Sequence, residues 1–143
     1  MRILICDDDT LIIEQLKKYI ESYFESNHLK CPELVSFTSG EALLTDKGEK
    51  DIVFLDIKMP KMDGIRVLEK RRRYEKNPKF VVLSCFNEYE YVREAMKLGA
   101  FDYLFKPLME GKDIAAVIKE IQAQDNKGEQ GEEQKNSSRS VMR

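Results

Sequence analysis

The chain has 143 residues, a formal net charge of −2 and 35% charged residues, which is enough sequence for one domain with its own core and a short extension. The small net charge does not indicate a surface that binds nucleic acid or membrane. No apolar stretch approaches the ~18 residues of a membrane span. Three cysteines without a Cys-x-x-Cys pair argue against a disulfide framework or zinc site and favour a reducing, cytoplasmic setting.

Short apolar runs alternate with helical periods in the first half of the chain. Residues 2–6 are predicted to form a strand, and Thr10 is predicted to cap a helix with apolar residues at helical spacing. Residues 33–37 are predicted to form a second strand, although their strand pattern is weaker, and Ser39 is predicted to cap a short helix. Residues 51–55 are almost continuously apolar, which indicates a strand buried on both faces.

The second half repeats this alternation after a loop rich in proline and glycine at residues 59–64. The remaining predicted elements are a basic helix to about Tyr74, a strand at 80–83, a helix at 88–98 that Gly99 ends, a strand at 101–105 and an amphipathic helix with Ile114, Val117, Ile118 and Ile121. Strands that alternate with helices favour a doubly wound α/β fold, with a five-stranded parallel sheet and five helices.

The apolar period stops near the end of the last predicted helix. From Asp125 onward the chain is rich in Gln, Glu, Lys, Ser, Asn and Gly, a composition typical of segments that cannot bury a core. We therefore predict one domain at residues 1–123 and a disordered tail or linker at residues 124–143.

Four predicted strands are followed directly by a reactive side chain. The groups are the run Asp7-Asp8-Asp9, the lone Asp56, the hydroxyl of Ser84 and the amine of Lys106. Parallel strands would bring all four to the carboxyl edge of one sheet, where ligands bind in open α/β folds.

The acids at this edge predict a metal site. Like charges within ~4–6 Å repel one another unless a cation intervenes, and nothing basic lies beside Asp7, Asp8 or Asp56 in sequence. Oxygen ligands with open positions suit Mg²⁺, and Mn²⁺ would also fit. Asp9 is expected to be a helix cap or a solvated loop residue instead.

The lone Asp56 suggests covalent chemistry. A carboxylate can act as a nucleophile and form an acyl phosphate, and catalysis of phosphoryl transfer rests on positioning and charge. Lys106 would add a positive charge and Ser84 a hydroxyl for the phosphoryl oxygens. Taken alone, Lys106 could be a surface lysine at a strand end, and Ser84 an ordinary strand-end serine.

Four strings in the chain match one family. They are Ile-Leu-Ile-Cys-Asp-Asp-Asp at 3–9, Phe-Leu-Asp-Ile-Lys-Met-Pro-Lys-Met-Asp-Gly at 54–64, Val-Leu-Ser at 82–84 and Lys-Leu-Gly-Ala-Phe-Asp-Tyr-Leu-Phe-Lys-Pro at 97–107. With them the chain resembles the receiver domain of bacterial two-component response regulators. The resemblance implies a flavodoxin-like fold with strand order 2-1-3-4-5.

The resemblance also implies roles for individual residues. Asp56 would be the phosphoacceptor, and Asp8 and Asp56 would bind Mg²⁺ with Asp7 helping through water. The metal ligands would include the backbone carbonyl of Lys58. Ser84 and Lys106 would contact the phosphoryl group, and the peptide bond between Lys106 and Pro107 would be cis.

A switch is a further implication of the resemblance. Ser84 would move toward the phosphoryl group, and Tyr103 would turn inward into the space it leaves. If the family resemblance is set aside, Tyr103 is interpreted as an ordinary half-buried aromatic residue. Lys58 and Phe86 occupy the two family positions that modulate the lifetime of the aspartyl phosphate, and a bulky Phe86 could shield it.

The family implies partners outside this chain. The phosphoryl donor would be a sensor histidine kinase, and the switched face would consist of the fourth helix, fifth strand and fifth helix. That face would control an output such as transcription, with homodimerisation through the last two helices as a family expectation. DNA would be bound only by an effector domain absent from this chain, because the chain has no helix-turn-helix pattern. Membrane contact is not expected.

Other functions fit less well. Such a domain is a phosphoacceptor that assists its own phosphorylation and slow dephosphorylation, not an enzyme with a separate substrate. The main alternative is a phosphate-independent interaction module on the same fold. An aspartyl-phosphate hydrolase usually needs a second acid two residues after the nucleophile, and Lys58 stands there.

Two groups outside the acid pocket are interpreted as structural. Cys6 and Cys85 flank the pocket and are predicted to be small packing residues without a redox role or a disulfide between them. The basic run at residues 70–73 is predicted to be a solvated helix face, because helix periodicity spreads four adjacent side chains around the axis.

Overall fold

A computed structural model describes residues 1–71 and 78–129 of the chain. Within these ranges the strands are β1 (Arg2–Cys6), β2 (Glu33–Phe37), β3 (Ile52–Asp56), β4 (Lys79–Ser84) and β5 (Asp102–Phe105). The helices are α1 (Thr10–Ser26), α2 (Gly40–Thr45), α3 (Gly64–Arg71), α4 (Tyr89–Lys97), the short 3₁₀ helix η1 (Lys106–Leu108) and α5 (Gly111–Glu129). All the helices here are too short or too polar to span a bilayer.

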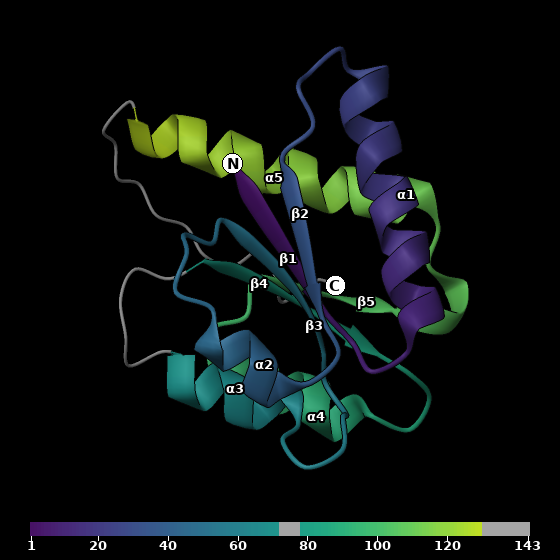
Figure 1. Cartoon of the computed structure of the whole chain (residues 1–143), viewed down its shortest axis with the longest axis vertical. Helices are drawn as coiled ribbons and strands as arrows, with labels where there is room; N and C mark the ends of the chain where they lie inside the picture. Colours follow the sequence, from purple (N-terminus) through teal and green to yellow (C-terminus); the bar gives the residue numbers. More distant parts are fainter. Residues whose placement is uncertain (72–77, 130–143) are drawn as a thin grey trace.

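The five strands form one parallel sheet in the order β2-β1-β3-β4-β5. The predicted flavodoxin-like α/β fold is therefore confirmed. Helices α1 and α5 cover one face of the sheet, and α2, α3 and α4 cover the other (Figure 1). Every residue of β3 is buried, as its apolar run predicted, because the strand lies at the centre of the sheet under helices on both sides.

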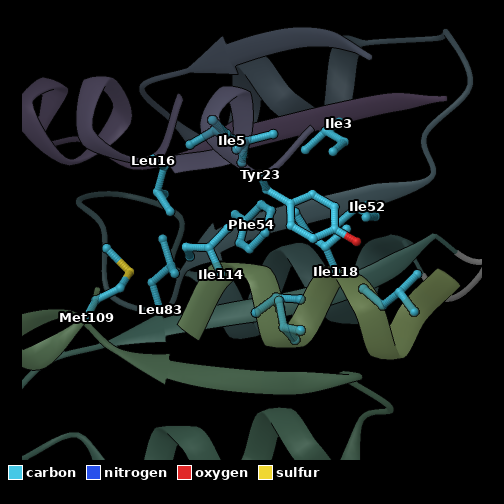
Figure 2. Close-up of a cluster of buried hydrophobic side chains, with 14 of the residues drawn as sticks. Ile3, Ile5, Leu16, Tyr23, Ile52, Phe54, Leu83, Met109, Ile114 and Ile118 are labelled. Atoms are coloured by element: carbon cyan, nitrogen blue, oxygen red, sulfur yellow. The ribbon is translucent and has the colours of Figure 1, made fainter. Parts of the chain in front are cut away.

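A hydrophobic core lies on each face of the sheet. On one face, side chains from β1, β3 and β4, such as Ile5, Phe54 and Leu83, pack against α1 and α5 (Figure 2). On the other face, Leu4, Val53 and neighbouring side chains pack against α2, α3 and α4. The two cores hold the strand ends in register, and that register positions the site.

The N-cap of one helix differs from the sequence prediction. Asp9, not Thr10, caps α1, because the Asp9 side chain accepts a hydrogen bond from the backbone N–H of Leu11 (2.9 Å). The predicted cap of α2 at Ser39 is confirmed. Helix α5 continues to Glu129, past the predicted domain end at residue 123. The rest of the predicted tail, residues 130–143, lies outside the described residues.

The predicted solvated face of basic residues is wrong for one member. Arg71 ends α3, and its guanidinium donates hydrogen bonds to the backbone carbonyls of Leu43 (3.3 Å) and Asp46 (3.2 Å) at the end of α2. This basic side chain therefore joins two helices, because the last carbonyls of α2 need donors. Residues 72–77, which include the rest of the basic run, lie outside the described residues.

Candidate functional site

The sheet register brings the predicted acids together. Strands β1 and β3 are parallel neighbours with Cys6 opposite Leu55, so the next residues, Asp7 and Asp56, leave the sheet at the same edge. One oxygen from each of Asp7, Asp8 and Asp56 lies within 4.8 Å of the others. Asp7 is fully buried and Asp56 is 3% exposed, whereas Asp8 is open to solvent.

Asp9 does not belong to this acid cluster. Its carboxylate caps α1, and its backbone N–H donates to Oδ1 of Asp7 (2.9 Å). The start of α1 therefore orients Asp7 toward the pocket. Sequence analysis predicted this separation of Asp9 from the three other acids.

Lys106 lies among the buried acids. Its Nζ is 3.0 Å from Oδ2 of Asp7 and 3.2 Å from Oδ1 of Asp56, and its side chain is only 12% exposed. Lys106 is distant from the acids in sequence, but the end of β5 brings it to the edge where the strand pattern predicted it. Lys106 therefore already neutralises part of the acid charge.

One lysine does not remove the cost of burying these carboxylates. Burial, together with the charge of Asp7, raises the pKa of Asp56 from an ordinary 3.8 to about 7, although Lys106 acts in the opposite direction. Burial likewise raises the pKa of Asp7. The oxygens of the three carboxylates are ligands that fit a divalent cation, and its charge, added to that of Lys106, would favour their ionised forms.

The predicted switch residues Ser84 and Tyr103 lie on the neighbouring strands β4 and β5. Ser84 ends β4, next to β3, and its buried hydroxyl lies 3.5 Å from the carbonyl oxygen of Leu104. Tyr103 is half-buried on β5, and the two residues line one groove between α4, β5 and the β4–α4 loop. The structure thus brings the hydroxyl and the aromatic side chain to one surface.

The side chains of Lys58 and Phe86 contact aromatic rings. The Nζ of Lys58 lies 4.8 Å from the centroid of the Tyr91 ring on α4, and the ring of Phe86 packs edge-on against Phe105 with centroids 4.9 Å apart. Phe86 is 69% exposed. Sequence reasoning missed Tyr91, because nothing in the sequence relates a residue of α4 to the loop after β3.

The predicted cis peptide bond between Lys106 and Pro107 is wrong. No peptide bond between described residues is cis. Pro107 lies in the first turn of η1, where the fixed φ of proline and its missing N–H are tolerated.

Cys6 is a packing residue, as predicted, whereas Cys85 is half-buried beside the groove lined by Ser84 and Tyr103. Cys6 is buried against the α2–α3–α4 face, with its Sγ 3.3 Å from the carbonyl oxygen of Ser39. Cys6, Cys31 and Cys85 are all free, so no disulfide joins Cys6 to Cys85.

Comparison with known proteins identifies the family of the chain. Residues 3–119 match the family described as the response regulator receiver domain. The chain belongs to this family. The receiver is 35% identical over 121 residues to the chemotaxis protein CheY of Treponema pallidum (strain Nichols), a match that covers 82% of this chain and 83% of that protein.

A longer relative has the receiver as one part. The uncharacterized transcriptional regulatory protein YesN of Bacillus subtilis (strain 168) is 35% identical over 129 residues, which are 87% of this chain but 34% of that protein. This chain therefore spans about a third of the length of that relative.

Solved structures share the receiver fold. A CheY-like receiver domain protein from Methanospirillum hungatei superimposes with a TM-score of 0.74 at 28% identity, over 88% of this chain and 97% of that one. The receiver domain of AraT from Geobacillus stearothermophilus gives a TM-score of 0.75 at 24% identity, over 90% of this chain and 97% of that one, and supports the fold alone.

Membership of the receiver family makes the chain a signalling receiver rather than a classical enzyme, and a receiver implies a histidine kinase as partner.

Proposed function

We propose that Asp56 accepts a phosphoryl group from a phosphohistidine of a sensor histidine kinase. The observation that carries the proposal is the position of Asp56: a buried carboxylate at the end of the central strand, clustered with two other acids and paired with Lys106. An oxygen of Asp56 attacks phosphorus, the bond from phosphorus to the histidine nitrogen breaks, and that nitrogen keeps the electron pair.

The other pocket residues assist this transfer by charge and hydrogen bonding. Asp7, Asp8, Asp56 and the backbone carbonyl of Lys58 would hold Mg²⁺, or Mn²⁺ in its place, and the bound ion would supply positive charge to the phosphoryl oxygens. Lys106, freed from one carboxylate when that carboxylate is phosphorylated, contacts a phosphoryl oxygen. The Ser84 hydroxyl donates to another.

The switch follows from the shared groove. A phosphoryl group adds close to two negative charges and three acceptor oxygens, so the Ser84 hydroxyl turns toward it and away from the Leu104 carbonyl. Tyr103, which lines the same groove, then turns inward. The face formed by α4, β5 and α5 changes shape as a shift between existing conformations.

The output is proposed to be transcription, because one relative is named as a transcriptional regulatory protein. DNA contact would then belong to an effector domain outside this chain, and α4 and α5 would offer a homodimer surface. The proposed setting is the cytoplasm, where the kinase domain of a sensor would meet the receiver.

Intact-mass measurement tests the phosphoacceptor. The purified chain is incubated with acetyl phosphate in Mg²⁺, in Mn²⁺ or in EDTA, beside Asp56→Ala and a control, Asp63→Asn. Asp63 lies in the same loop, but its carboxylate accepts from the backbone N–H of Arg66 at the start of α3. We expect a metal-dependent phosphate adduct on the parent and on Asp63→Asn, and none on Asp56→Ala.

The opposite result would identify the alternative. No adduct with either metal would favour a phosphate-independent interaction module. An adduct that persists in Asp56→Ala would place the acceptor on another residue.

A further inference from the structure

The backbone of Lys58 lies next to Asp56, whereas its side chain extends to Tyr91 on α4. Its backbone N–H lies 3.5 Å from Oδ1 of Asp56. Its side chain is exposed, and its ammonium lies over the ring of Tyr91 at 4.8 Å from the ring centroid. Within residues 1–71 and 78–129, Lys58 takes part in no ion pair, whereas Lys106 pairs with two carboxylates of the same pocket.

The ring, rather than the lysine, is the fixed member of this contact. Tyr91 is half-buried on α4 and packs against the core of the α2–α3–α4 face. The stem of Lys58 is flexible and exposed, so the ring determines where its ammonium rests. At an exposed site a cation–π contact of this kind favours the held position by about 2- to 5-fold.

Phosphorylation of Asp56 would offer this ammonium a second position. The phosphoryl group adds close to two negative charges at a carboxylate only two residues from Lys58. Four methylene groups allow the ammonium to reach either the ring or the phosphoryl oxygens. Loss of the ring would leave the phosphoryl group as the remaining attraction.

We propose that Tyr91 is a positioning residue that holds the Lys58 ammonium away from the phosphoryl group and so maintains the rate at which the aspartyl phosphate is hydrolysed. The inference rests on the proposed phosphorylation of Asp56. It assigns to a residue of α4 control over the lifetime of the signal, through a contact outside the acid pocket.

Hydrolysis requires access from solvent. A water oxygen attacks phosphorus in line with the bond to Asp56, that bond breaks with its electron pair left on the carboxylate, and inorganic phosphate leaves while the water proton passes to solvent. A lysine drawn onto the phosphoryl oxygens occupies the side from which this water approaches. Release of Lys58 from Tyr91 therefore slows hydrolysis.

A double-mutant cycle tests the proposal. Tyr91→Leu and Tyr91→Phe are prepared in the parent and in Lys58→Met, and each protein is phosphorylated with acetyl phosphate and Mg²⁺. After the donor is removed, intact mass follows the loss of the adduct. Tyr89→Leu is the matched control, because Tyr89 is a more exposed tyrosine of the same helix for which no contact with Lys58 is observed.

The cycle has a definite expected result. Tyr91→Leu slows decay by about 2- to 5-fold, Tyr91→Phe keeps the parent rate because the ring remains, and Tyr91→Leu has no effect in the Lys58→Met background. An equal slowing in both backgrounds would mean that Tyr91 acts without Lys58 and would overturn the proposal. So would an unchanged or faster decay in Tyr91→Leu.

An independent readout separates this proposal from the function on which it rests. In NMR spectra of the unphosphorylated protein, the Lys58 side-chain protons should be shifted upfield by the ring in the parent and Tyr91→Phe, and not in Tyr91→Leu. Absence of that shift in the parent overturns the contact itself. A normal shift with no adduct on any variant would refute phosphorylation, and with it any role in lifetime, while leaving the contact established.

Discussion

The ammonium of Lys106 lies 3.2 Å from Oδ1 of Asp56, although β4 separates the strands that these two residues follow. The same ammonium reaches Asp7 at 3.0 Å. One lysine at the end of β5 therefore bridges the carboxylates of β1 and β3. The stability of the folded protein therefore depends on the charges of Lys106 and of these two carboxylates.

Lys106→Met should destabilise the metal-free protein by about 1–3 kcal/mol, because it leaves two buried carboxylates without their cation. Saturating Mg²⁺ should reduce this loss, because a bound cation replaces the missing charge. Urea unfolding in EDTA measures the loss of stability in the metal-free protein, and urea unfolding in Mg²⁺ measures how far the cation reduces that loss. The control is Lys112→Met, whose pair with Glu110 is solvent-exposed and should matter little. Equal losses with and without Mg²⁺ would contradict the prediction.

Asp56→Asn should stabilise the metal-free protein more at pH 8 than at pH 5. The folded state holds the pKa of Asp56 at about 7, through burial and then the charge of Asp7, against an ordinary 3.8. A raised pKa means that stability contributed by this carboxyl is present below pH 4 and is lost as the pH rises to 7. Asparagine removes this titration, so the gain should grow by up to about 4 kcal/mol over that window.

Urea unfolding of both proteins in EDTA, across this pH range, measures the difference. Parallel stability curves for the parent and Asp56→Asn would show that Asp56 does not titrate in this window. Added Mg²⁺ should flatten the parent curve, because a cation favours the ionised carboxylate.

Sequence patterns predicted the strands because burial constrains composition. The nearly unbroken apolar run at residues 51–55 indicated a strand buried on both faces, and β3 (Ile52–Asp56) is buried throughout. The acids Asp7, Asp8 and Asp56 were predictable as a cluster for a related reason: each follows directly on a strand, and parallel strands end at a common edge.

Contacts between distant side chains were not predictable in this way. Lys106 was predicted at this edge because it follows a strand, but its direct pairing with Asp7, 99 residues away, was not. Tyr91 contacts Lys58 through helix packing that no periodicity encodes. The apolar pattern, whose last buried member is Ile121, also does not define where α5 ends. A helix can continue on backbone hydrogen bonds and residues such as Gln and Ala after its buried face has ended, as α5 does up to Glu129.

Thiol alkylation under native conditions should modify Cys31 first and leave Cys6 unmodified. Cys31 is exposed, whereas Cys6 is buried, and burial raises the pKa of the Cys6 thiol to about 12. Cys85 is half-buried and should react at an intermediate rate. Mass spectrometry after iodoacetamide treatment gives the order, with urea-unfolded protein as the control in which all three react. Early modification of Cys6 would mean that the sheet edge opens readily.

Gly64→Ala should destabilise the protein by about 1–3 kcal/mol and impair the site. A Cβ at Gly64 would lie 2.7 Å from the backbone oxygen of Asp56 and 2.8 Å from Cα of Ile57. These are backbone atoms, so the loop that carries Asp56 must shift to admit a methyl group. Gly64 also donates its N–H to the Ile57 carbonyl at 2.9 Å, which fixes the start of α3 against that loop.

Gly111→Ala is the matched control for this substitution. Gly111 begins α5, and its nearest obstacle would be the side-chain ring of Tyr19 at 3.3 Å, which can move. Alanine there should change stability by less than about 1 kcal/mol. Urea unfolding measures stability, and the yield of phosphate adduct reports the position of Asp56. If Gly64→Ala matched Gly111→Ala in both measurements, close packing of α3 against Asp56 would not be what positions the carboxylate.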